Sequence, residues 1–167
     1  MTEVETQRSA PTQAVGLAIS LMICFAAGGI GGWATTQGLD AWYETLDKPT
    51  WNPPNWAFAP VWTTLYGSMG IAVWLVWRSG TWKEVKSAVV LFTIQLVLNG
   101  MWSVLFFGLQ NPGGALIEIV GLWLAIVATT VLFFRRSVIA GGLMIPYLLW
   151  VSFASFLNFT IWNLNRI

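Results

Sequence analysis

Tryptophan is the residue of this chain best suited to hold a flat ligand or to carry electrons, and it occurs 12 times in 167 residues. Histidine is absent and Cys24 is the only cysteine, which excludes a Ser-His-Asp triad, a Cys-His pair and a zinc cluster. Cys24 lies within an apolar run, where a thiol is expected to be an inert hydrophobic group. We therefore predict no metal site and no cofactor, and aromatic and amide side chains remain as candidates for a binding site.

Two of the tryptophans belong to a proline-rich stretch at residues 48–56, between two long apolar runs. Pro53 and Pro54 lack a backbone N–H and favour extended geometry at the preceding residue, which predicts a stiff, non-helical lid. Such a lid would direct Trp51 toward a flat, apolar ligand. The alternative is that Trp51 and Trp56 lie in the aromatic belt at the membrane interface.

The elements that must position these residues are predicted from the apolar runs. Apolar residues make up 56% of the chain and charged residues 9%, and a run of about 20 apolar residues is what a helix needs to cross a bilayer. We therefore predict an all-α integral membrane protein, a five-transmembrane-helix bundle with a long structured loop between helices 1 and 2. The predicted helices span residues 13–35, 57–77, 87–108, 113–134 and 137–164, in one membrane domain at residues 13–165 that follows a mobile tail at residues 1–12. Within the loop, Asp40 is expected to cap one or two helical turns.

Three of the predicted helices carry a row of mostly aromatic and amide side chains along one face, at helical spacing. They are Phe58, Trp62 and Tyr66 in the second helix, Asn99 and Trp102 in the third, and Trp150, Ala154 and Asn158 in the fifth. If these faces converge, they enclose an apolar pocket with a few placed polar groups, which is the usual composition of a small-molecule site. Trp33 and the glycines near it would add to the outer wall.

Three polar residues within the apolar runs have alternative roles. Gln95 and Asn99 are costly in hydrocarbon unless they face protein or ligand, so hydrogen bonding between helices is the alternative to a ligand role. Glu118 either lies at the wet interface or has a function inside the membrane. The sequence shows neither a series of ionisable groups across the membrane nor a polar pore lining, which argues against a proton-coupled pump and a channel.

The basic residues predict how the chain is oriented. The amino-terminal tail and the second and fourth loops contain six Lys and Arg residues, whereas the other loops and the carboxyl-terminal tail contain two. The positive-inside rule then places the amino terminus in the cytoplasm, and loop 1 and the carboxyl terminus outside. The net charge of +1 gives no reason to expect a nucleic-acid partner.

Four motifs occur in order along the chain. They read Lys48-Pro-x-Trp-Asn-Pro-Pro-x-Trp56, Pro60-Val-Trp-x-x-Leu-Tyr66, Gln95-Leu-x-Leu-Asn99-x-x-Trp102 and Pro146-Tyr-Leu-x-Trp150. Together they resemble the translocator protein or tryptophan-rich sensory protein family (TspO/MBR), as a bacterial-type member. The resemblance implies a five-helix bundle, commonly a homodimer, that binds tetrapyrroles such as protoporphyrin IX and other flat hydrophobic molecules beneath loop 1.

The resemblance also implies which residues bind the ligand and what is done with it. The implied ligand-binding positions are Trp33, Trp51, Phe58, Trp62, Tyr66, Asn99, Trp102, Trp150 and Ala154. The first hypothesis is a membrane receptor or sensor whose partners are a tetrapyrrole and the lipid bilayer, with Lys48 available to pair with a propionate. The first alternative is an enzyme that degrades porphyrin oxidatively under light, with Trp51 and Trp150 as catalytic redox groups. The others are a transporter of porphyrin-like ligands and a scaffold without a ligand. Sterol binding through the family's sterol motif is not expected, because residues 148–152 after Tyr147 contain no Lys or Arg.

Overall fold

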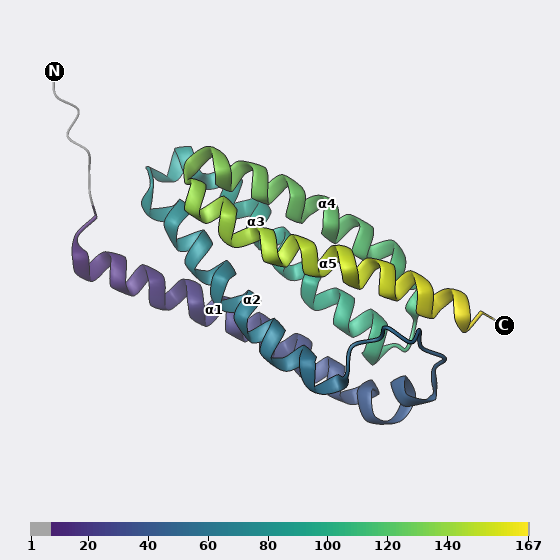
Figure 1. Ribbon diagram of the computed structural model, residues 1–167. Helices are drawn as coiled ribbons and strands as arrows, with labels where there is room; N and C mark the ends of the chain where they lie inside the picture. The colour runs from purple at the N-terminus through teal and green to yellow at the C-terminus, as the bar shows by residue number, and fades with distance from the viewer. Residues whose placement is uncertain (1–7, 167) are drawn as a thin grey trace, which may run out of the picture.

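The computed structural model describes residues 8–166, which form five long helices arranged as a bundle (Figure 1). The helices are α1 (Ala10–Gly38), α2 (Asn55–Arg78), α3 (Trp82–Ser103), α4 (Pro112–Arg136) and α5 (Val138–Leu164), and two π-helical turns, η1 (Leu39–Tyr43) and η2 (Val104–Gly108), extend α1 and α3. The described residues contain no strand. Because each of the five helices is long and apolar enough to cross a membrane, the predicted all-α integral membrane fold is confirmed.

Capping residues determine where two of the helices begin. α3 begins at Trp82 rather than at residue 87, because Thr81 and Glu84 form a capping box in which the Thr81 backbone N–H donates to the Glu84 carboxylate at 2.6 Å. At the start of α4, the Asn111 side chain accepts a hydrogen bond of 2.9 Å from the Gly114 backbone N–H. Both caps shorten the connections before α3 and α4, so each of these helices runs antiparallel to the helix before it.

The first helix extends beyond the predicted residues 13–35 at both ends. It begins at Ala10, so residues 10–12 of the predicted tail are helical, while residues 1–7 lie outside the described residues. At its other end the helix runs through Gly38 into η1, and Asp40 lies inside this π-helical turn instead of capping a separate helix. A Cβ on Gly38 would lie only 2.5 Å from the carbonyl oxygen of Phe107, so glycine allows α1 to approach the backbone of η2.

Two clusters of buried side chains form the core. The larger cluster runs through the middle of the bundle and includes Cys24, which is fully buried as expected for an inert thiol. The smaller cluster combines side chains from η1, η2, α4 and α5, namely Tyr43, Phe106, Phe107, Ala115, Leu157 and Ile161. The second cluster therefore packs both π-helical turns against the last part of α5.

The loop at residues 44–54 crosses the end of the bundle at which α1 and α5 end, which we call the loop end (Figure 1). The Tyr43 hydroxyl donates to the Asn52 side-chain oxygen at 2.7 Å, and the Lys48 ammonium donates to the Tyr43 carbonyl at 2.7 Å. Asn165 accepts from the Asp47 backbone N–H and donates to the Asp47 carbonyl, both at 3.0 Å. The loop is therefore structured, as predicted, and is attached to both η1 and the end of α5.

Candidate functional site

A cavity of about 520 Å³ lies inside the bundle toward the loop end. All five helices and both π-helical turns contribute side chains to it. Seven of the nine predicted ligand-binding residues line this cavity, namely Phe58, Trp62, Tyr66, Asn99, Trp102, Trp150 and Ala154. Its volume lies within the range of about 300–1,000 Å³ that is usual for small-molecule sites.

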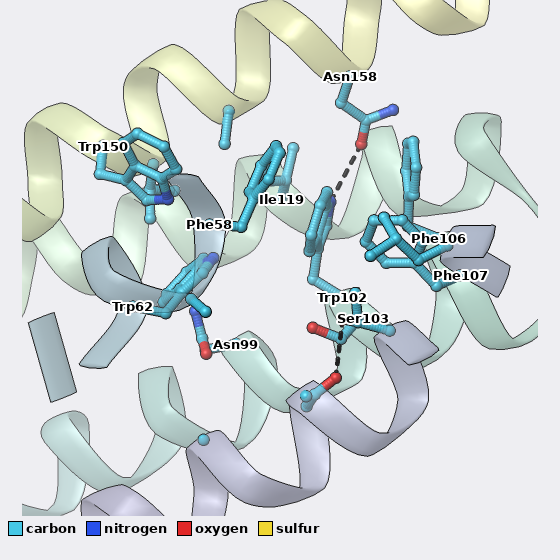
Figure 2. A pocket seen from close by; sticks show the side chains of 18 of the residues that line it. Phe58, Trp62, Asn99, Trp102, Ser103, Phe106, Phe107, Ile119, Trp150 and Asn158 are labelled. Carbon is cyan, nitrogen blue, oxygen red and sulfur yellow. Dashed lines mark hydrogen bonds between the residues drawn. The ribbon is translucent and has the colours of Figure 1, made fainter. Parts of the chain in front are cut away.

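Aromatic rings form two walls of the cavity (Figure 2). On one side the Trp150 ring meets Phe58 edge-on at 6.0 Å between centroids and Trp62 at 6.4 Å. On the other side Trp102 stacks on Phe106 at 5.1 Å. Because these contacts fix the ring orientations, the cavity presents preformed apolar faces to a flat molecule.

Several polar groups of the cavity are already hydrogen-bonded within the protein. The Tyr66 hydroxyl donates to the side-chain oxygen of Asn99, so this buried phenol has a hydrogen-bond partner. The Trp102 indole N–H donates to the Asn158 oxygen at 3.1 Å (Figure 2). The Asn158 amide donates to the Pro112 carbonyl at 2.8 Å. These bonds join α2 to α3 and α3 to α5, so they hold the cavity open while satisfying its buried polar atoms.

The described residues that line the cavity include no Asp, Glu, Lys or Arg. Lys48, the cation expected to pair with a ligand carboxylate, instead donates to the carbonyls of Tyr43 and Glu44 at 2.7 and 3.3 Å. Its ammonium also lies 3.9 Å from the Glu44 carboxylate. The site therefore offers dipoles and ring faces, and it suits the uncharged part of a ligand.

A comparison with known protein families matches residues 20–163 to the TspO/MBR family. The matched residues include most of the five helices around the cavity. The chain belongs to this family. The tryptophan-rich protein TspO of Chlorobaculum tepidum is 50% identical over 155 residues, covering 92% of this chain and 98% of that protein. The translocator protein of Homo sapiens is 40% identical over 127 residues, covering 75% of each chain. A tryptophan-rich sensory protein of Cereibacter sphaeroides is 38% identical over 135 residues, covering 79% of this chain and 84% of that protein.

TspO/MBR membership confirms the resemblance seen in the motifs. The family and the names of its members support a membrane sensor or receptor in general terms.

Two predicted ligand-binding residues of this TspO/MBR chain lie outside the cavity. Trp51 stacks on Phe156 at 5.3 Å with an interplanar angle of 14° and meets Phe153 edge-on at 5.8 Å, which places it against the outer side of α5. Trp33 is 67% exposed, because it lies about 200° around α1 from the buried Gly31. The lid therefore covers the loop end without inserting Trp51 into the site.

Other cavity residues were missed by the sequence analysis. Ile119 and Leu122 of α4 line the cavity, and their spacing of three residues in an apolar helix is a signal that could have indicated them. Tyr43 and Phe107 also line it, but they are positioned by the π-helical turns, which no sequence pattern predicted. Side chains of the irregular helical turns therefore close the TspO/MBR site at the loop end, and the proline-rich stretch is hydrogen-bonded to Tyr43 through Asn52.

The remaining intramembrane polar residues have different surroundings. Gln95 is fully buried and accepts a hydrogen bond of 2.9 Å from the Tyr147 hydroxyl, so it joins α3 to α5 and does not line the cavity. Both carboxylate oxygens of Glu118 are buried and have no hydrogen-bond partner among the described residues. Glu118 therefore does not lie at the wet interface, which was the alternative that its position near a helix end suggested.

Proposed function

We propose that this TspO/MBR protein is a membrane receptor or sensor that binds tetrapyrroles of the protoporphyrin IX type, and other flat hydrophobic ligands, in the aromatic cavity beneath the loop. The observation that carries this proposal is that ring faces from α2, α3 and α5 converge on a single apolar cavity. Stacking on indole and phenyl faces favours planar guests. The Asn99 amide and the hydroxyl of Tyr66 provide the polar contacts that orient one edge of the ligand.

The test is a titration of the purified protein with protoporphyrin IX, followed by quenching of tryptophan fluorescence. We expect saturable quenching at micromolar ligand. Replacing Trp150 by Ala removes the ring that contacts both Phe58 and Trp62, so the affinity should fall at least tenfold, which corresponds to about 1.4 kcal/mol. The matched control is Trp51→Ala, which removes an indole outside the cavity and should change the affinity less than threefold. Absence of saturable binding by the wild-type protein favours the scaffold hypothesis.

Light-dependent oxidative degradation of porphyrin is the second candidate, and one observation favours it. Trp150 is at the cavity wall, and the Phe153 ring lies between it and Trp51, at 5.5 and 5.8 Å between centroids. The two indoles proposed as redox groups are thus linked by a third aromatic ring. Illumination of the complex should bleach the pigment faster than free pigment, and Trp150→Phe should remove the excess. Bleaching equal to that of free pigment excludes the enzyme.

Transport of the ligand and assembly of the protein are tested separately. A transporter should produce ligand flux into sealed proteoliposomes, and binding without flux excludes transport. We also expect a homodimer, which the mass of the protein–detergent complex would show.

The distribution of cations supports an orientation with the amino terminus in the cytoplasm. Six of the eight Lys and Arg residues, namely Arg8, Arg78, Lys83, Lys86, Arg135 and Arg136, lie at the end of the bundle opposite the loop. A test is to place a cysteine at Thr50 in a Cys24→Ala background. A membrane-impermeant maleimide added to intact cells should label it, and labelling only after lysis contradicts the orientation.

A further inference from the structure

α1 and α2 touch in the first part of α1 and separate toward the loop end. At Gly28 the two helices are so close that a Cβ would lie 2.6 Å from the ring of Tyr66 in α2. Three residues later the neighbour has changed, because the atom nearest to a Cβ on Gly31 is the hydroxyl oxygen of Ser103 in α3, at 3.3 Å. The last part of α1 thus packs against α3 and η2, so α1 no longer lies beside the first part of α2, which packs on α5 through Phe58.

The cavity extends into this gap. Its lining includes exposed residues from the facing edges of both helices, which together we call the lateral slot: Gly29, Gly32 and Thr36 of α1, and Ala59 and Thr63 of α2. A Cβ on Gly29 or on Gly32 would meet no atom within 4 Å among the described residues, so none of these residues fills the slot there. The cavity is therefore open sideways, at the level of the membrane-spanning helices.

The surface of the lateral slot is apolar although it contains two threonines. The Thr36 hydroxyl donates to the Trp33 carbonyl at 2.8 Å, and the Thr63 hydroxyl donates to the Ala59 carbonyl at 2.8 Å. Because both hydroxyl protons are used within their own helices, a passing molecule meets mainly methyl groups and glycine backbone. A hydrophobic ligand can cross such a surface without losing hydrogen bonds of its own.

The alternative route, through the loop end, is closed. Tyr43 is only 2% exposed and packs against Phe107 at 5.6 Å, and its hydroxyl is bonded to Asn52. Asn55 at the start of α2 donates to the Glu44 carboxylate at 2.8 Å. A ligand arriving from water would have to break several of these contacts, whereas one dissolved in the bilayer meets an existing opening.

We infer that the ligand enters and leaves the cavity sideways from the bilayer, through the lateral slot between α1 and α2. This inference rests on the proposed function. It adds the route of entry, and it specifies the ligand as a flat hydrophobic molecule taken from the lipid phase. The loop end stays closed during exchange.

The test measures the rates of protoporphyrin IX binding to the protein in lipid nanodiscs, by stopped-flow tryptophan quenching. Gly32→Phe and Gly29→Phe put a ring into the empty slot, so association and dissociation should both slow at least fivefold. Gly142→Phe in α5 is the matched control, because a Cβ there also meets no atom within 4 Å, and it should leave both rates unchanged. Unchanged rates in both slot variants, or a faster dissociation with normal association, overturn the lateral route.

A second variant tests the loop end. Asp47 and Asn165 lie side by side, so cysteines at these two positions in a Cys24→Ala background should link the loop to α5 when oxidised. We expect equal binding rates in the oxidised and reduced protein, with oxidation verified by loss of free thiols. Slower binding on oxidation places the route at the loop end and overturns the inference. If the wild-type protein does not bind the pigment at all, the proposed function fails before either comparison is made.

Discussion

Gly38 provides the sharpest test of how the bundle is packed. A Cβ at this position would lie 2.5 Å from the carbonyl oxygen of Phe107 and 3.2 Å from its carbonyl carbon. Both atoms belong to the backbone and cannot rotate away, so α1 or η2 must move by about 1 Å to restore an ordinary contact of about 3.5 Å. Overpacking of this kind costs about 1–3 kcal/mol. Gly38→Ala should therefore lower the free energy of unfolding, although alanine favours helix by about 1 kcal/mol relative to glycine.

The measurement is equilibrium unfolding in mixed detergent micelles, followed by circular dichroism. Gly142→Ala is the control, because its Cβ meets no atom within 4 Å and only the helix propensity changes. The control should raise the free energy of unfolding by up to about 1 kcal/mol, so the two alanines shift stability in opposite directions. If both variants are stabilised equally, α1 does not contact η2 at Gly38 and the description of this end of the bundle is wrong.

Three further predictions concern single polar groups. Tyr66→Phe leaves the Asn99 oxygen without its donor, so the free energy of unfolding should fall by about 1–3 kcal/mol, and an unchanged value would show that another group replaces the hydroxyl. Glu118→Gln replaces an ionisable carboxyl, buried without a partner among the described residues, by an uncharged amide, so the thermal midpoint near pH 7 should rise; a lower midpoint would reveal a partner for the carboxyl. Burial raises the pKa of Tyr43 from 10.0 to about 12. Between these pH values the phenol is ionised in the unfolded protein and neutral in the folded protein, so the free energy of unfolding falls as the pH rises. Tyr43→Phe should lose less stability across that window, as unfolding measured at pH 9 and pH 11.5 would show; an equal loss would contradict this account.

The number and type of the helices could be predicted because hydrocarbon thickness sets a minimum length of apolar sequence. The helix ends were less predictable, for two reasons. The capping box of Thr81 and Glu84 is present in the sequence, but charged residues around it interrupt the apolar run, so the third helix was predicted to begin only at residue 87. The extension of α1 through η1 depends on the contact between Gly38 and Phe107, which lie far apart in sequence, so no local pattern signals it.

The cavity residues on helices were predictable because helical spacing fixes which side chains share a face. Trp62 and Trp150 are such residues, and both line the cavity. Trp51 lies in a non-helical loop, where spacing says nothing about direction, and its ring stacks on Phe156 instead. Trp33 is on a helix, but an indole is stable either in a pocket or at the lipid interface, and the sequence does not distinguish these environments.

The uncharged lining of the cavity determines how the site responds to an electric field. Moving one elementary charge through the whole membrane potential is worth about 2.3 kcal/mol per 100 mV, and the described lining residues carry no charge that could move. Occupancy by a neutral guest should therefore be the same in an energised and a de-energised membrane. Any voltage dependence of binding would have to come from charges on the guest itself, such as carboxylates drawn part of the way into the field.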